Sequence, residues 1–146
     1  MMEDSKAKVV WKGKMSFEGS AESGFSLPLG TSVESGGDND GFRPMELLLV
    51  GLAGCTAMDV ISILEKKGQD VTGFEVRVVE AERAAAHPKV YTHIVLEYVV
   101  TGRNVERAAV ERAVELSATK FCSAEGMLGK VARIENKITL LEAEQV

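Results

Sequence analysis

The chain has 146 residues, of which 45% are hydrophobic and 27% are charged, and its formal net charge is −5 at pH 7. This length and composition are ordinary for one soluble domain with a single core, so we expect one domain over residues 1–146. The negative charge, without a Lys/Arg cluster, excludes a typical nucleic-acid-binding surface. The first residues have neither the basic nor the apolar part of a signal peptide, and we therefore expect a cytoplasmic protein.

The N-terminal part predicts a small β-meander followed by a loop. Residues 8–12 and 15–19 indicate two short strands, and residues 23–29 indicate a third, which Pro28 places at a sheet edge. Residues 31–41 are rich in glycine and acidic side chains, but they lack the periodic ligands and the closing glutamate of a calcium loop. We expect a solvated loop there.

Residues 44–64 form the longest apolar run of the chain and contain one of its two cysteines, Cys55. The run begins with a proline and is followed by Lys-Lys-Gly at 66–68, which suit the start and the end of a helix. Apolar side chains point in almost every direction around it, which predicts a buried central helix. The uncharged stretch between Glu46 and Asp59 is shorter than the ~20 residues that a membrane span needs. We therefore expect no membrane partner.

The rest of the chain alternates between strands and helices. Five segments follow in order: a strand at 71–83, a strand at 89–101, an amphipathic helix at 105–117, a short helical turn at 123–128, and a strand at 132–141. Asn104 is expected to cap the amphipathic helix. A meander, a buried helix, a hairpin, a second helix and a last strand together predict an α+β fold.

The two cysteines have different local surroundings. Cys55 lies about three helical turns after Pro44. It is thus beyond the first turn in which a helix dipole acts, and Asp59 one turn later would oppose ionisation of its thiol. Cys122 is expected at a bend where a helix restarts, and a helix N-terminus favours a thiolate. The residues alone therefore predict a quiet thiol at Cys55, and either a working thiol or a small core residue at Cys122.

Three further polar residues are weaker candidates. His87 in a turn and His93 on a strand have no cysteine or carboxylate at ligand spacing, so we do not expect a metal site. Asp59 is the unusual charge in an apolar helix. It is either a hydrogen-bonding structural residue or a general acid.

Residues 44–60 read Pro-Met-Glu-Leu-Leu-Leu-Val-Gly-Leu-Ala-Gly-Cys-Thr-Ala-Met-Asp-Val, and the second cysteine, Cys122, follows much later in the chain. This pattern resembles the osmotically inducible protein C / organic hydroperoxide resistance (OsmC/Ohr) family. That family has a Pro-x-Glu-Leu-Leu helix, a cysteine nine residues after the glutamate and a second cysteine well over sixty residues later. Three more motifs match one subgroup: Thr-His-Ile at 92–94, Thr-Gly-Arg at 101–103 and Lys-x-Cys-Ser at 120–123.

The resemblance implies a thiol-dependent peroxidase that acts on organic hydroperoxides and is built as an intertwined homodimer. Cys55 would be the peroxidatic thiol, oxidised to a sulfenic acid, and Cys122 the resolving thiol that condenses with it to a disulfide. An external dithiol would reduce the pair by exchange, and no cofactor is expected. Glu46 matches the glutamate that orients an arginine beside the reactive sulfur.

The activating cation is where this sequence departs from the family. The family's arginine lies outside the cysteine helix, on an N-terminal strand or loop, whereas no arginine precedes Arg43 here. Arg43 is the candidate on this pattern. The other possible cations are Lys12, Lys14, Arg77, Arg83 and Arg103.

Helix geometry supports the homodimer. On one straight helix, Glu46 lies ~13 Å and Arg43 ~18 Å from Cys55 along the axis, and Glu46 is half a turn out of phase with it. An antiparallel pair of these helices, crossing near residues 50–51, would bring Glu46 of one copy towards Cys55 of the other. The small residues of 51–54 would allow the close approach.

Two alternatives to a peroxidase stay open. One is a binding module that holds a small acyl or lipid-like ligand in an apolar pocket at the dimer interface. The other is a structural homodimer whose thiols only fill the core. Loss of free thiols after addition of an organic hydroperoxide separates the peroxidase from both.

Overall fold

A computed structural model describes residues 5–144 of the chain. The chain divides into two compact units, Met1–Leu48 and Leu49–Val146. The long helix α1 (Pro44–Lys66) begins in the first unit and continues through the second.

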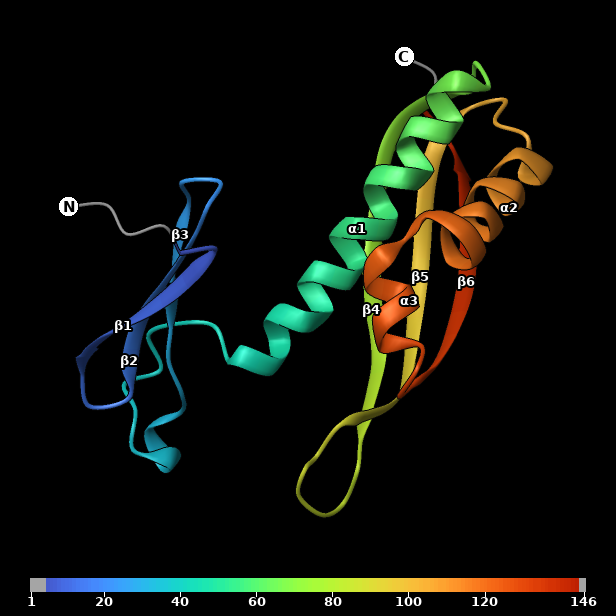
Figure 1. Cartoon of the computed structure of the whole chain (residues 1–146). Helices are drawn as coiled ribbons and strands as arrows, with labels where there is room; N and C mark the ends of the chain where they lie inside the picture. The colour runs from blue at the N-terminus through green and yellow to red at the C-terminus, as the bar shows by residue number, and fades with distance from the viewer. Residues whose placement is uncertain (1–4, 145–146) are drawn as a thin grey trace. The chain divides into compact units, whose positions relative to one another are not determined.

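The first unit contains a three-stranded antiparallel sheet (Figure 1). Its strands, in the spatial order β1-β2-β3, are β1 (Ala7–Gly13), β2 (Ser16–Ala21) and β3 (Ser26–Leu29). This confirms the predicted meander, and Pro28 lies on the edge strand β3 as expected. β3 begins at Ser26 rather than at residue 23 because Gly24, with a φ of 94°, forms the turn before it.

The predicted loop after β3 is attached to the first sheet by side-chain contacts. It contains one short 3₁₀ turn, η1 (Val33–Ser35). Lys14 Nζ forms an ion pair with Asp38 at 3.1 Å, and Ser16 Oγ donates a hydrogen bond to Asp40 at 2.5 Å. These contacts anchor the loop to the turn between β1 and β2.

The second unit contains a three-stranded mixed sheet in the spatial order β4-β5-β6. Its strands are β4 (Asp70–Arg83), β5 (Tyr91–Arg103) and β6 (Arg133–Glu142). The predicted hairpin β4–β5 is antiparallel, whereas β5 and β6 are parallel and need a crossover connection. That crossover consists of α2 (Arg107–Leu116), a π-helical turn η2 (Ser117–Phe121) and α3 (Ser123–Leu128).

The core of the second unit lies between one face of this sheet and the helices, which cover that face together (Figure 1). Alternate residues of β5 point to the same face because the side-chain period of a strand is two. Four fully buried residues of α1 lie at four-residue spacing, which makes one stripe along the helix. The fully buried side chains on the facing sides of these two elements are Ile94, Leu96, Tyr98 and Val100 on β5 and Leu52, Thr56, Val60 and Leu64 on α1.

The start of α2 differs from the prediction. The N-cap is Glu106, without a side-chain capping bond, and Asn104 is not a cap. Asn104 has a φ of 51°, a left-handed conformation that asparagine tolerates, and its N–H donates to the Glu142 carboxylate at 3.1 Å. Asn104 therefore ends the turn after β5, and the helix begins two residues later than a cap at Asn104 would start it.

One chain buries α1 only in part, so its predicted burial against a second copy stays a prediction. In its most apolar 18-residue window only 22% of the residues are buried. Leu48, Val50 and Met58 are 45%, 57% and 75% exposed. By length and composition α1 is the one helix among the described residues that could cross a membrane, because its 23 residues exceed the shorter uncharged stretch considered in the sequence. One such helix is weak evidence for a membrane span, since the core helices of soluble proteins pass the same test. The chain alone leaves much of the apolar surface of α1 uncovered.

Candidate thiol site

The fold brings the two cysteines together. Cys55 lies on α1, and Cys122 lies between η2 and α3. Both thiols are free, Cys122 is buried and Cys55 is partly exposed. The Cys55 thiol lies close enough to Cys122 to raise the pKa of Cys122. Two residues that are far apart in the sequence are therefore neighbours in the fold, as the two thiols of a disulfide-forming pair must be.

The π-helical turn η2 positions Cys122. The N–H of Cys122 donates to the carbonyl of Ser117 at 2.8 Å, a bond that spans five residues instead of four. Ser117 and Cys122 at the two ends of the turn are both buried, while Phe121 between them is half exposed. The wider turn thus directs both Ser117 and Cys122 into the core.

Burial controls the thiol of Cys122. Cys122 is the N-cap of α3, and its Sγ accepts the N–H of Glu125 at 3.4 Å, which confirms the predicted bend and restart. The expected thiolate is not favoured, because burial raises the pKa of Cys122 to about 11. The Glu125 N–H lowers this pKa in part, whereas the interaction with Cys55 raises it further. At pH 7 only about one Cys122 side chain in 10⁴ is a thiolate.

A chain of hydroxyl groups lies beside the thiol pair in the core. Tyr98 Oη and Thr56 Oγ1 are 2.8 Å apart, and Thr56 Oγ1 and Ser117 Oγ are 2.7 Å apart. Ser117 Oγ donates to the Asp59 carboxylate at 2.9 Å. Because each hydroxyl has one hydrogen, Thr56 must donate to Ser117 and Tyr98 must donate to Thr56. Tyr98 keeps its proton, since burial raises its pKa.

These hydrogen bonds give Asp59 a structural role. The bond from Ser117 confirms the prediction of a hydrogen-bonding residue, and it links α1 to η2. Through Thr56 and Tyr98 the same bonds extend to β5. The hydroxyl chain fixes the relative positions of the three elements around Cys55 and Cys122.

Glu125 is a second acidic residue beside the thiols, and it was not among the residues predicted from the sequence. Its side chain is 8% exposed, and its Oε2 atom has no hydrogen-bond partner among the residues that the structure describes. Burial raises its pKa above the ordinary value. Its charge raises the pKa of both Cys122 and Tyr98, which shows that it lies near both.

Arg43 and Glu46 interact in the first unit, but not as the family pattern suggests. Glu46 Oε1 accepts the backbone N–H of Arg43 at 2.8 Å. The guanidinium of Arg43 donates instead to Asn39 Oδ1 at 2.6 Å and to the Gly41 carbonyl at 3.0 Å. Glu46 therefore satisfies a free N–H at the start of α1, and the loop residues orient the arginine.

Most of the other candidate cations bind partners elsewhere. Four of them have these contacts: Lys14 with Asp38, Arg77 with Glu75 and Glu97, Arg83 with the Lys89 carbonyl, and Arg103 with Asp70. Within residues 49–144, no lysine or arginine donates a hydrogen bond to either thiol. The second unit by itself does not supply a cation to the pair.

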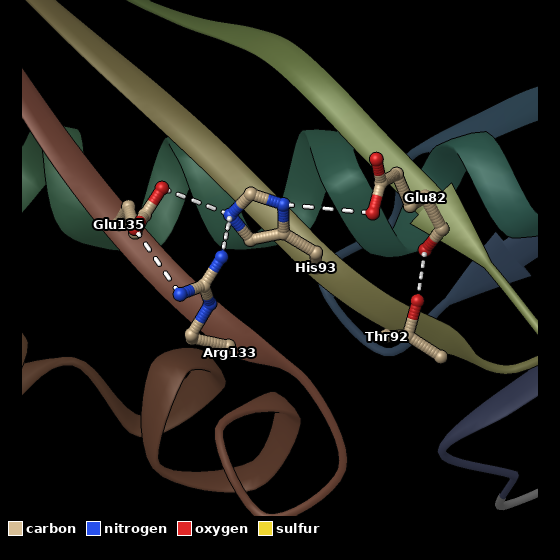
Figure 2. A network of polar contacts seen from close by, with 5 residues as sticks. All are labelled: Glu82, Thr92, His93, Arg133 and Glu135. Atoms are coloured by element: carbon tan, nitrogen blue, oxygen red, sulfur yellow. Dashed lines mark hydrogen bonds and ion pairs between the residues drawn. The ribbon is translucent and has the colours of Figure 1, made fainter.

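His93 belongs to a separate network on the other face of the sheet, because positions 93 and 98 of β5 point in opposite directions. Figure 2 shows His93 between Glu82 and Glu135, with Arg133 beside it. His93 Nε2 lies 2.9 Å from Glu135 Oε2, and Nδ1 lies 3.7 Å from Glu82. Among the described residues, no group of three or more His, Cys, Asp or Glu side chains is arranged so that it could hold a metal ion.

This network makes a pH-dependent contribution to stability through Glu135. Its hydrogen bond with His93, and then the charge of Arg133, hold the pKa of Glu135 below its usual value. The contribution is present above the pKa of the unfolded chain and is lost as the pH falls through the folded value. The loss of this contribution occurs at acidic pH and does not involve the thiols.

The family model described as OsmC-like protein matches residues 37–137, which include both cysteines. The chain belongs to the OsmC-like family. Protein YhfA of Escherichia coli (strain K12) is 39% identical to this OsmC-like chain over 137 residues, covering 94% of this chain and 98% of YhfA. The resemblance in the sequence is thereby confirmed at the level of family.

Solved structures of relatives share the fold of this OsmC-like protein. A hypothetical protein from Aquifex aeolicus VF5 has 30% sequence identity and a TM-score of 0.82, with 98% of this chain and 100% of that chain covered. A protein from Legionella pneumophila, described as an organic hydroperoxide resistance protein OsmC, has 16% identity and a TM-score of 0.69, with 91% and 94% covered. At that identity the likeness concerns the fold alone.

Proposed function

We propose that this OsmC-like protein is a thiol-dependent reductase of organic hydroperoxides that works through Cys55 and Cys122. The observation that carries the proposal is the neighbouring pair of free thiols, assembled from α1 and the crossover between β5 and β6. Chance pairing of the only two cysteines of a chain in its core is less expected than a redox pair, particularly in this family.

Accessibility supports a peroxidatic role for Cys55 and a resolving role for Cys122. Cys55 is partly exposed and can meet a hydroperoxide, whereas Cys122 is buried behind it. The thiolate of Cys55 attacks the O–O bond, takes one oxygen to become a sulfenic acid and releases an alkoxide, which leaves as an alcohol after protonation. Cys122 then displaces the sulfenic oxygen as water and forms a disulfide. A dithiol, available in the cytoplasm, restores both thiols by exchange.

The cation that activates Cys55 comes, in this proposal, from a second copy of the chain. Arg43 is held by Asn39 and Gly41 and is thereby a positioned cation at the start of α1. Much of the apolar surface of α1 is exposed in one chain. An antiparallel pair of α1 helices would cover this surface and bring Arg43 and Glu46 of one copy to Cys55 of the other.

Light scattering tests the assembly. We expect the mass of a dimer at micromolar protein concentration, because exposure of this much apolar helix surface is unfavourable in water. The mass of a single chain at that concentration would contradict the shared site, and the activating cation would then have to come from the chain itself.

Counting thiols tests the activity. After addition of cumene hydroperoxide, the reduced wild type is expected to lose two thiols per chain rapidly. Cys55→Ser is expected to keep its remaining thiol, Cys122, because the buried thiol has almost no thiolate at pH 7. Free thiols are measured by alkylation and mass spectrometry in samples quenched over time.

The matched control is Cys122→Ser, which removes the other thiol of the pair. If wild type retains both thiols in excess hydroperoxide, the peroxidase proposal is wrong. If Cys55→Ser loses Cys122 as fast as wild type loses its thiols, Cys55 is not the residue that reacts with the peroxide.

A second candidate function rests on a separate apolar groove in the first unit. The groove has a volume of about 390 Å³ and is lined by side chains that include Val9, Phe25 and Leu47. This volume is within the range of small-molecule sites, so a small acyl or lipid-like ligand fits it. Mass spectrometry of the native protein for a copurified ligand distinguishes this function, which does not need the thiols.

A further inference from the structure

The buried thiol of Cys122 must lose its proton before it can act in disulfide formation. The fate of this proton matters only if the thiol pair works as in the proposed function, on which this inference rests. A thiolate, rather than a thiol, is the attacking species in disulfide formation. Cys122 is 5% exposed, so hydroxide from solvent reaches it poorly. Burial also keeps almost all of it protonated at pH 7. Disulfide formation therefore needs a base inside the core.

Glu125 is placed to be that base. It lies one helical turn after Cys122, and its backbone N–H donates to the Cys122 Sγ at 3.4 Å. The side chain is more than nine-tenths buried, and Oε2 has no hydrogen-bond partner among the described residues. A buried carboxylate oxygen without a hydrogen-bond partner destabilises a protein, so a purely structural role does not account for it.

The local sequence would ordinarily give Glu125 a structural role. Cys122 at the N-cap and Glu125 three residues later have the spacing of a capping box, in which the glutamate accepts the N–H of the N-cap residue. Here that N–H donates to the Ser117 carbonyl across the π-helical turn instead. The π-helical turn therefore leaves the carboxylate of Glu125 available beside the thiol.

We propose that the Glu125 carboxylate accepts the proton of Cys122 as its sulfur attacks the sulfenic acid of Cys55, and returns this proton to the departing oxygen. The Cys122 sulfur supplies the electron pair of the new S–S bond, and the pair of the broken S–O bond leaves with the oxygen. That oxygen takes the proton from Glu125 and departs as water, which restores the carboxylate. A base can act directly or through one water molecule.

The other groups near Cys122 are engaged elsewhere, so Glu125 is the candidate base. Asp59 on α1 accepts the hydrogen bond of Ser117, and Tyr98 on β5 is a protonated donor to Thr56. The charges that act on Cys122 come from Cys55 and Glu125. No other carboxylate among these groups acts on the thiol.

The test isolates the attack of Cys122 from the peroxide chemistry. The probe is 5,5′-dithiobis(2-nitrobenzoate), a coloured aromatic disulfide that forms a mixed disulfide with the accessible Cys55 and releases one thiolate anion. Cys122 then displaces a second coloured anion. Stopped-flow absorbance resolves the two phases over a range of pH, in wild type and in Glu125→Gln.

We expect Glu125→Gln to leave the first phase unchanged and to slow the second phase about 10²- to 10⁴-fold at pH 7, the usual size of general-base catalysis. In wild type the second phase is expected to be nearly independent of pH between the pKa values of Glu125 and Cys122. In Glu125→Gln it should rise tenfold per pH unit. Loss of a neighbouring negative charge alone would do the opposite, since it would lower the pKa of Cys122 and speed the second phase.

Two further variants make the result decisive. Glu125→Asp retains a carboxylate and is expected to retain the flat pH profile at a reduced rate, which also covers the case in which the glutamine variant folds poorly. Glu115→Gln removes an exposed carboxylate of α2 and is expected to match wild type. A second phase in Glu125→Gln with the wild-type rate and slope overturns the proposal.

The outcomes also separate this proposal from the proposed function. If cumene hydroperoxide produces no sulfenic acid at Cys55 while the coloured disulfide shows the expected effect of Glu125→Gln, the protein is not a peroxidase but Glu125 serves its thiol pair. If sulfenic acid forms normally and the second phase does not depend on Glu125, the peroxidase proposal stands and the role of Glu125 is wrong.

Discussion

Cys122→Ser is expected to stop the reaction with an organic hydroperoxide at the sulfenic acid of Cys55. The neighbouring thiol that would condense with this group is absent in the variant, and a serine hydroxyl does not form a disulfide. A well-placed intramolecular group has an effective molarity on the order of 10⁵ M or more, so the sulfenic acid should persist at least about 10³-fold longer than in wild type without added thiol. Mass spectrometry should show a gain of one oxygen.

Excess peroxide supplies the contrast with wild type. The unprotected sulfenic acid of Cys122→Ser is expected to gain further oxygens and become sulfinic and sulfonic acids, whereas wild type should lose two hydrogens and stay at the disulfide. Dimedone, which captures sulfenic acids, is the independent readout. A wild-type sulfenic acid that lasts as long as that of Cys122→Ser would show that Cys122 does not resolve it.

Leu96→Ala is expected to lower the free energy of unfolding by about 2–5 kcal/mol, the usual range for removing a fully buried leucine side chain. Leu96 is 0% exposed on β5, the central strand of its sheet, so few neighbours can move to fill the cavity. Urea unfolding of the reduced protein, followed by circular dichroism, measures the change in midpoint at constant slope.

The matched control uses the same substitution on the same sheet. Leu141 on β6 is 47% exposed, and Leu141→Ala is expected to change the free energy of unfolding by less than about 1 kcal/mol. Equal effects of the two substitutions would mean that the outer part of β6 is covered in solution or that the core relaxes around position 96.

Side-chain periodicity predicted most elements because it depends on local sequence. The alternation in β4 and β5 and the apolar run of α1 are examples, and their bounds differ by few residues from those expected. The start of α2 was wrong because Asn104 is bound by Glu142, 38 positions later in the chain. The π-helical turn was not predicted either, since it depends on Ser117 and Cys122 both facing the core.

The site was harder to predict than the fold because its interactions are tertiary. The spacing of Cys55 and Cys122 indicated a pair only through the family resemblance. Thr56, Tyr98 and Ser117 received no role, although a polar residue on an apolar helix face, such as Thr56 or Ser117, was a usable signal. Their partners could not be named without the packing of α1 against β5 and η2.

The expected thiolate at Cys122 shows why local electrostatics was insufficient. The helix terminus was predicted correctly, and one N–H does lower the pKa of the thiol. α3 has only six residues, and desolvation of a buried thiol outweighs what a single N–H provides. The local sequence indicates the helix cap, but it does not indicate how deeply that cap is buried.

The long separation of the thiol pair along the chain has a consequence for folding. A bond between Cys55 and Cys122 would close nearly half of the chain into one loop in the unfolded state. By the chain-entropy estimate, such a cross-link disfavours the unfolded ensemble by about 4 kcal/mol, a substantial fraction of the total stability of a small domain. Each round of oxidation and reduction would therefore also raise and then lower the free energy of unfolding. The reduced form, which reacts with the substrate, would be the less stable of the two.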